Sequence, residues 1–127
     1  MADAILLVDD DQNILNLEQA ILSKQGYDVT LAQGGKECLA LLAERDFDLV
    51  LLDVMMPDVD GYTVCRKIRA ETRFDDMPVI FLTAKGGGQA LSEGFDAGAA
   101  MYISKPFTAS KLREMVKTAL DARGAKT

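Results

Sequence analysis

The chain has 127 residues, 49% of them apolar, which is enough for one domain with a buried core and too few for two domains of ordinary size. Acidic residues number 20 against 14 lysines and arginines, so the net charge is -6; no basic stripe is present, and direct binding of nucleic acid is not expected. The absence of histidine excludes histidine zinc sites, nucleophile pairs that use histidine, and a role as a phosphohistidine carrier.

The N-terminus and the cysteines indicate the cellular compartment. Residues 1–12 contain five consecutive apolar residues followed by three acids, without a basic leader, so neither a signal peptide nor a membrane span is expected. We therefore expect a cytoplasmic protein that does not bind membranes. Cys38 and Cys65 are far apart in predicted helices, and in that compartment two free thiols, partly in the core, are expected.

Short apolar runs alternate with helix-period segments along the whole chain. The first run, Ala4 to Val8, predicts a strand that ends in three acids: Asp9, Asp10 and Asp11. The helix that follows is stopped by Gly26. Its apolar face is predicted to hold Ile14, Leu17, Ile21 and Leu22. Val29 and Leu31 alternate with polar residues, which predicts a less buried edge strand.

The middle of the chain holds the most apolar run. After a glycine turn and a helix with the stripe Cys38, Leu41 and Leu42, the residues Leu49 to Leu52 predict a strand buried on both faces. This strand ends in Asp53, and a turn that contains Pro57 and Gly61 leads into a helix starting near Asp60. The helix is predicted to bury Val64, Cys65 and Ile68 and to expose Arg66, Lys67 and Arg69. We interpret Asp11, Asp58 and Asp60 as helix-cap or loop residues.

Two further units complete the chain. Val79 to Leu82 predicts a fourth strand ending in Thr83, and a loop then leads to a helix that Gly98 closes. A short fifth strand, Met101 to Ile103, is followed by Ser104, Lys105 and Pro106. The last helix has the apolar stripe Leu112, Met115, Val116, Ala119 and Leu120.

Strands that alternate with helices in this way predict an α/β fold with a parallel sheet and right-handed crossovers. Five such units match the flavodoxin-like, doubly wound, five-stranded sheet of order 2-1-3-4-5, with five helices distributed over both faces. We expect a single domain over residues 1–127, with a core at about 3–122 and a short polar C-terminal tail.

This strand order places the acids together. Strands one and three become neighbours, with the topological switch point between them, so Asp9, Asp10 and Asp53 are predicted to share one pocket. Thr83 and Lys105 leave the next two strands at the same edge of the sheet. Strands are spaced by roughly 4.8 Å, so Lys105 starts roughly 10 Å from strand three, a gap that a lysine side chain spans.

The chemistry of such a pocket favours a divalent cation. Three close carboxylates repel one another, and a hard cation such as Mg²⁺ removes that repulsion. An aspartate is also a known phosphoryl acceptor. Phosphoryl transfer requires positioning and charge neutralisation, which a cation, the ammonium of Lys105 and the hydroxyl of Thr83 supply.

The motifs at these strand ends resemble those of the receiver domain of two-component response regulators, over essentially the whole chain. They are VDD at Val8 to Asp10, LDVMMPDVDG at Leu52 to Gly61, PVIFLTA at Pro78 to Ala84, and AGAAMYISKPF at Ala97 to Phe107. Each motif alone is weak evidence, but their order and spacing together are highly specific.

The resemblance implies a role for each residue. Asp53 is similar to the family's phosphoacceptor, Asp10 to a direct Mg²⁺ ligand, and Asp9 to a partner that holds the metal through water. The backbone carbonyl of Met55 is a further implied ligand. Lys105 is expected to pair with Asp53 or its phosphoryl group, Thr83 to bond a phosphoryl oxygen, and Tyr102 to act as the switch aromatic. The Lys105–Pro106 bond is expected to be cis, as in the family.

By the same resemblance, we expect a phosphorylation-controlled signalling switch rather than a turnover enzyme. A sensor histidine kinase or a histidine phosphotransfer protein would donate the phosphoryl group, and a downstream protein that the sequence does not name would read the face formed by the fourth helix, the fifth strand and the last helix. Only residues 121–127 follow the last helix, so the chain is either a chemotaxis-type single-domain receiver or a piece of a longer protein.

Three other functions compete with this one. A phosphatase with an aspartyl nucleophile needs a second aspartate two residues after the first, where Met55 stands. A flavin or nucleotide site would bring phosphate against three acids without a cation. A pseudo-receiver that binds partners without phosphorylation remains the alternative. Gly86 to Gly88 match no phosphate-loop pattern, and we interpret them as a mobile loop.

Overall fold

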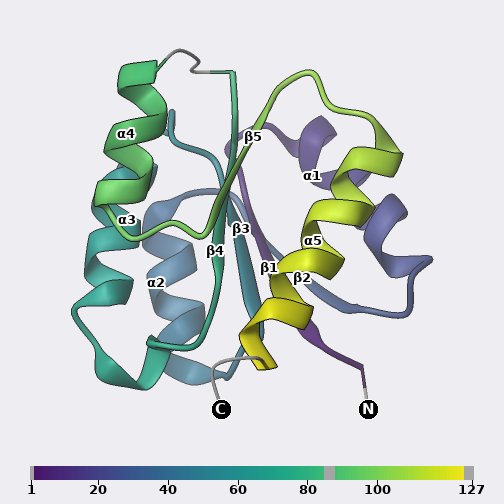
Figure 1. Ribbon diagram of the computed structural model, residues 1–127, viewed down its shortest axis with the longest axis horizontal. Coiled ribbons are helices and arrows are strands. Elements are labelled where there is room, and N and C mark those ends of the chain that lie inside the picture. Colours follow the sequence, from purple (N-terminus) through teal and green to yellow (C-terminus); the bar gives the residue numbers. More distant parts are fainter. Residues whose placement is uncertain (1, 85–87, 125–127) are drawn as a thin grey trace.

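Five parallel strands form one sheet in the order β2-β1-β3-β4-β5, as the sequence predicts (Figure 1). The structure is a computed structural model that describes residues 2–84 and 88–124. The strands are β1 (Ala4–Val8), β2 (Asp28–Ala32), β3 (Leu49–Leu52), β4 (Val79–Thr83) and β5 (Met101–Ser104). The helices are α1 (Gln12–Ser23), α2 (Gly35–Glu44), α3 (Gly61–Arg69), the 3-10 helix η1 (Thr72–Phe74), α4 (Gly88–Asp96) and α5 (Ala109–Gly124).

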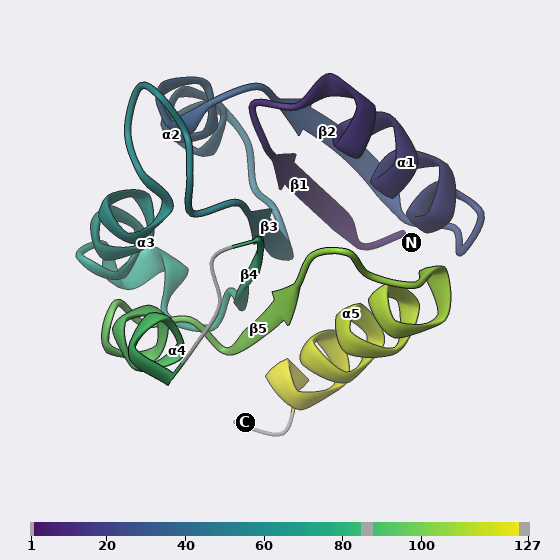
Figure 2. The ribbon, with the colours of Figure 1, turned by 90° about the horizontal axis from the view of Figure 1, so that it is seen from above.

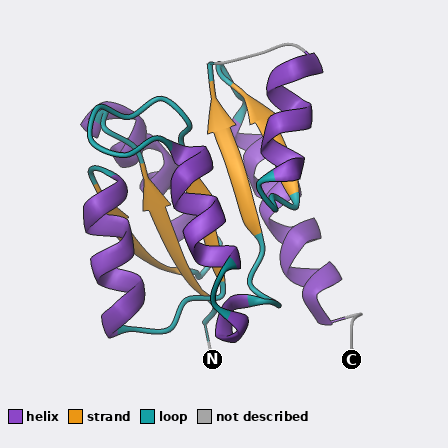
Figure 3. Ribbon diagram, turned by 90° about the vertical axis from the view of Figure 1, so that its left-hand side faces the viewer, coloured by secondary structure: helices purple, strands orange, loops and turns teal. Residues whose placement is uncertain are grey.

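The helices cover both faces of the sheet, as the doubly wound fold requires. Seen from above, α1 and α5 lie on one side of the strands, and α2, α3 and α4 lie on the other (Figure 2). Figure 3 shows the strands running in one direction, with helices in front of them and behind them. Alternate residues of each central strand therefore enter two separate cores. For example, Leu6 packs with the α2 and α3 residues, whereas Leu7 packs with those of α1 and α5.

The register of β1 and β3 brings their ends to the same level. Val8 is paired with Leu52, so the next residues, Asp9 and Asp53, leave neighbouring strands side by side. Their amides remain tied to the sheet: the N–H of Asp53 donates to the carbonyl of Val8 at 3.0 Å. The two acids are thus positioned by the backbone of the sheet and not by a loose loop.

The buried face of α1 differs from the prediction. Leu15, Glu18 and Leu22 are buried, whereas Leu17 is 48% exposed. Residues 15, 18 and 22 follow the helical period and face the sheet together. The prediction followed side-chain hydrophobicity and so rotated the face toward Leu17, because position 18 holds a glutamate.

Arg69 was predicted to face water, and this was wrong. Its guanidinium donates to three backbone carbonyls, those of Gly98 at 2.9 Å, Phe74 at 2.8 Å and Met77 at 2.7 Å. The side chain also packs closely on Gly98, whose φ is +105° and where an added Cβ would lie 2.5 Å from Cγ of Arg69. One arginine therefore joins the end of α3, the η1 turn and the α4–β5 connection.

Helix ends follow the sequence signals. The carboxylate of Asp11 accepts from the amide of Asn13 at 2.9 Å and caps α1, and that of Asp60 accepts from Thr63 at 2.9 Å and caps α3. Gly26, after α1, has a φ of +87°. The predicted loop at Gly86 to Gly88 lies, apart from Gly88, outside the described residues. Over residues 2–84 and 88–124, none of the helices combines the length and the apolar character needed to cross a membrane.

Candidate functional site

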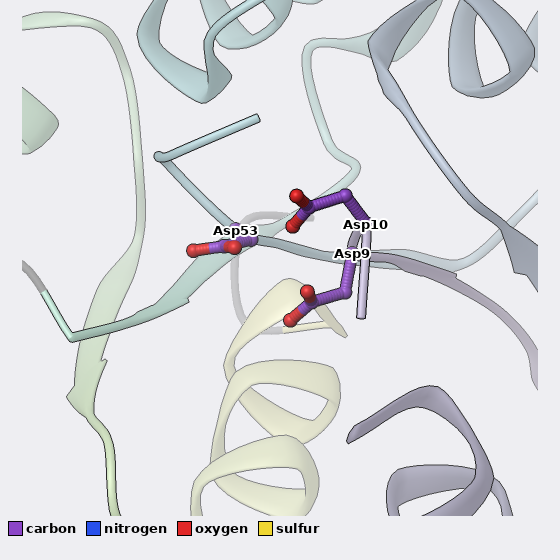
Figure 4. A group of neighbouring side chains, drawn as sticks. All are labelled: Asp9, Asp10 and Asp53. Carbon is purple, nitrogen blue, oxygen red and sulfur yellow. The ribbon is translucent and has the colours of Figure 1, made fainter. Parts of the chain in front are cut away.

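Three carboxylates meet where β1 and β3 end, as predicted from the strand order. One oxygen from each of Asp9, Asp10 and Asp53 lies within 4.8 Å of the others (Figure 4). Asp9 and Asp53 are only 1% and 5% exposed, whereas Asp10 is exposed. The cluster thus has a buried floor and one solvent-facing side, through which a ligand can reach it.

The environment of Asp53 favours its uncharged form. Burial raises the pKa of Asp53, and the neighbouring charge of Asp9 raises it further. Three contacts act in the opposite direction: the charge of Lys105, a hydrogen bond from the Thr83 hydroxyl, and the amide of Met55, which donates at 3.4 Å. The net pKa remains raised, and a cation bound at the site would lower it by favouring the carboxylate form.

Lys105 reaches the cluster from β5, but its nearer partner is Asp9 and not Asp53. Its Nζ lies 2.7 Å from Oδ2 of Asp9 and 3.6 Å from Oδ2 of Asp53. Burial lowers the pKa of Lys105, but the hydrogen bond to Asp9 and the charges of Asp53 and Asp9 outweigh that effect and raise it. The Lys105–Pro106 bond is cis, as expected from the resemblance.

The contacts of Asp9 bear on which acids a cation would contact. Oδ1 of Asp9 accepts from the amide of Asp11 at 2.9 Å, and Oδ2 accepts from Lys105 at 2.7 Å. Both oxygens therefore already have protein donors. Asp10 is exposed, and Asp53 has longer contacts than Asp9, 3.4 Å to the Met55 amide and 3.6 Å to Lys105. These two acids are therefore the better candidates for direct ligands, whereas the closely held Asp9 is better suited to contact through water. The donor set, carboxylate oxygens with room for water, fits Mg²⁺.

Glu18 is a buried acid next to this site that the sequence reasoning missed. It is 2% exposed, and no hydrogen-bond partner among the described residues reaches its Oε1. Burial, followed by the charge of Asp9, raises its pKa to about 8, although Lys105 acts in the opposite direction. The helical period of α1 was the available signal, because position 18 falls between Leu15 and Leu22 on the buried face.

Thr83 and Tyr102 lie on the side of the sheet covered by α3 and α4. The Thr83 hydroxyl contacts Asp53, and Phe81, two residues earlier, points to the same face. The ring of Phe81 lies 5.3 Å from that of Tyr62 and 6.2 Å from that of Tyr102. The hydroxyls of Tyr62 and Tyr102 are hydrogen-bonded, and burial raises the pKa of Tyr102 to about 12.

A cavity of about 510 Å³ opens beside the acids. Its lining includes Asp10, Met55, Asp60, Tyr62 and Glu93. Met55 is 62% exposed at its edge. Gly61 holds the loop close to the strand end: its amide donates to the carbonyl of Val54 at 2.8 Å, and a Cβ there would lie 2.3 Å from the carbonyl oxygen of Asp53.

Comparison with solved structures places this fold among receiver domains. A crystal structure of a response regulator receiver domain protein (CheY-like) from Methanospirillum hungatei matches with a TM-score of 0.92 and 32% identity, covering 100% of both chains. The family described as the response regulator receiver domain matches residues 5–117. The chain belongs to this family.

Two curated relatives show how the match is distributed. The DNA-binding dual master transcriptional regulator RpaA of Synechocystis is 42% identical over 116 residues, which are 91% of this chain and 48% of that protein. Response regulator MprA of Mycolicibacterium vanbaalenii is 43% identical over 116 residues, 91% of this chain and 49% of that protein. The chain thus spans about half the length of the curated relatives it matches. Receiver domains are signalling domains and not turnover enzymes, and the family typically uses Mg²⁺ at an acidic pocket.

Proposed function

We propose that this chain is a phosphorylation-dependent switch of a two-component system, with Asp53 as the phosphoryl acceptor. The observation that carries the proposal is the meeting of Asp9, Asp10 and Asp53 within 4.8 Å, with the ammonium of Lys105 against two of them, in a chain of the receiver family. The donor is a sensor histidine kinase or a histidine phosphotransfer protein.

The transfer uses an oxygen of Asp53 as the nucleophile. This oxygen forms a bond to phosphorus while the bond between phosphorus and the donor's imidazole nitrogen breaks. The electron pair of that bond leaves with the imidazole, which takes a proton from solvent. The carboxylate form of Asp53 is the nucleophile, and Lys105 and Thr83 favour this form by lowering its pKa against the effect of burial.

We propose that Asp10, Asp53 and the carbonyl of Met55 hold Mg²⁺ directly, with Asp9 contacting it through water. When bound, the ion supplies positive charge that neutralises the carboxylates and the transferring phosphoryl group. Lys105 keeps Asp9 in place at 2.7 Å and lies near enough to Asp53 to pair with the new phosphoryl oxygens.

The signal is read through a change of partner affinity between two conformations. The Thr83 hydroxyl contacts Asp53. We propose that it moves to bond a phosphoryl oxygen after phosphorylation and that the side chain of Tyr102 moves with it. The surface read by the downstream protein is the one formed by α4, β5 and α5.

The test is modification with acetyl phosphate and Mg²⁺, followed by intact mass spectrometry. Wild type and Asp11→Asn, which alters a cap and leaves the acceptor, should gain one phosphoryl group, whereas Asp53→Asn should gain none. Beryllofluoride with Mg²⁺ should shift the NMR signals of Thr83 and Tyr102 in wild type. An unmodified wild-type chain that still binds partners would favour the pseudo-receiver alternative and refute the proposal.

A further inference from the structure

Asp58 lies in the loop after β3 but caps a different helix, α2. The residue at the N-cap position of α2 is Gly34, which has no side chain to offer. The amides of Gly35 and Lys36 instead donate to Oδ1 and Oδ2 of Asp58, at 3.1 and 3.0 Å. Both carboxylate oxygens thus bind the first turn of a helix that lies more than 20 residues earlier in the chain.

Two glycines make this approach possible. The φ of Gly34 is -175°, an extended value open to any residue, so its backbone does not require glycine. A Cβ at Gly34, however, would lie 2.8 Å from Oδ2 of Asp58. A Cβ at Gly35 would lie 2.8 Å from Val64 and 2.9 Å from Val59. The loop is therefore packed directly against the start of α2.

The two ends of the same loop are fixed by other contacts. At the β3 end, the amide of Asp53 donates to Val8 at 3.0 Å, and at the α3 end the amide of Gly61 donates to Val54 at 2.8 Å while Asp60 caps the helix. Asp58 fastens the stretch between these ends. Met55, whose carbonyl is the ligand proposed above, belongs to that stretch.

We propose that Asp58 is a positioning residue for the divalent cation, because its carboxylate ties the β3–α3 loop to α2 and so sets the place of the Met55 carbonyl. This inference rests on the proposed function. It predicts that the tether preorganises the site, so that cation affinity, and not the chemical step at saturating cation, depends on Asp58. Hydrogen bonds from Lys36 and Val59 lower the pKa of Asp58, which keeps the tether charged near neutral pH.

The tether can be broken from either side. Asp58→Ala removes the carboxylate. Gly34→Ala places a methyl group at 2.8 Å from Oδ2 and displaces the carboxylate without straining an extended backbone. Asp58→Asn keeps one oxygen acceptor and should therefore retain most of the wild-type Mg²⁺ affinity. Thr108→Ala is the matched control, because Thr108 caps its own helix by accepting from Lys111 at 3.0 Å, far from this loop in sequence.

Two quantities are measured. The first is the Mg²⁺ dissociation constant, by calorimetry without a phosphoryl donor, and the second is the rate of phosphorylation by acetyl phosphate at saturating Mg²⁺. Asp58→Ala and Gly34→Ala should each weaken Mg²⁺ binding by about 10-fold, at the lower end of what supporting residues of metal sites contribute, with rates within about twofold of wild type. The double variant should be no weaker than either single one, since both break one contact.

Two results would overturn the proposal, and they differ from each other. If Asp58→Ala lowers the melting temperature as Thr108→Ala does but leaves Mg²⁺ affinity unchanged, Asp58 is only a helix cap, and the proposed function stands. If wild type binds no Mg²⁺, the metal site of the proposed function fails, and the role of Asp58 fails with it.

Discussion

Glu18 gives the most direct test of the electrostatics described above. Its carboxyl is 2% exposed, and burial raises its pKa from 4.5 to about 8. Between these values the unfolded chain releases a proton that the folded chain keeps. Unfolding therefore becomes more favourable as the pH rises through this window, and the stability that protonated Glu18 permits is present below pH 4.5 and lost by about pH 8.

The magnitude follows from the pKa. Each tenfold difference in proton affinity corresponds to 1.36 kcal/mol, so a rise from 4.5 to about 8 corresponds to at most about 5 kcal/mol. Relaxation and water entry reduce this, and we expect about 2 kcal/mol between pH 5.5 and 7.5. A loss of that size matters in a domain whose total stability is about 5 to 15 kcal/mol.

The perturbation is Glu18→Gln, which keeps the shape and removes the titration. The free energy of unfolding of both chains is measured by urea unfolding from pH 5.5 to 7.5. A chelator is present so that no bound cation neutralises Asp9. Relative to wild type, the free energy of unfolding of Glu18→Gln should increase steadily as the pH rises. That of Glu44→Gln, at an exposed position on α2, should change with pH as wild type does. A wild-type to Glu18→Gln difference that stays constant over this range would refute the reasoning.

Three further outcomes follow from the contacts described above. Lys105→Met removes the ammonium that lies 2.7 Å from Asp9 and 3.6 Å from Asp53, so the transferring phosphoryl group loses a neutralising charge and modification by acetyl phosphate at pH 7 should fall at least about 10-fold, measured by mass spectrometry. Arg69→Lys leaves at least one of three carbonyls without a donor and should lower the free energy of unfolding by about 1 to 3 kcal/mol in urea, whereas Arg66→Lys, at an exposed position, should not. Gly61→Ala forces a methyl group to 2.3 Å from the Asp53 carbonyl and should destabilise the fold and slow phosphorylation, and normal rates in a stable variant would contradict the role of this approach.

The sheet and the meeting of the three acids followed from the sequence because each depends on a local signal combined with a topological rule. Four uninterrupted apolar residues before Asp53 indicate a buried strand, and acids after the first strand indicate its end. The strand order then makes β1 and β3 neighbours, as observed. No side-chain contact had to be known to place Asp9, Asp10 and Asp53 together.

The features that the sequence did not predict involve charged side chains whose surroundings belong to other segments of the chain. Arg69 binds carbonyls as far away as Gly98, and Lys105 prefers Asp9, 96 residues earlier, to Asp53. A sequence pattern assigns charged residues on helices to water, because their partners cannot be read from neighbouring positions. Glu18 is the sharpest case: its position obeys the helical period while its chemistry opposes burial, and there the period decides where the side chain lies.

The same distinction separates the roles of Asp58 and Asp60, although both were predicted to be helix-cap or loop residues. Asp60 caps the helix that follows it, so its role is local and could be read from sequence. Asp58 caps a helix from an earlier part of the chain and thereby links the loop after β3 to the first turn of α2. A local cap acts mainly on the stability of its helix, whereas a cap between segments also fixes their relative position. For this reason the effect of Asp58 is expected in cation affinity, where the loop position matters, and that of Thr108 is expected in stability alone.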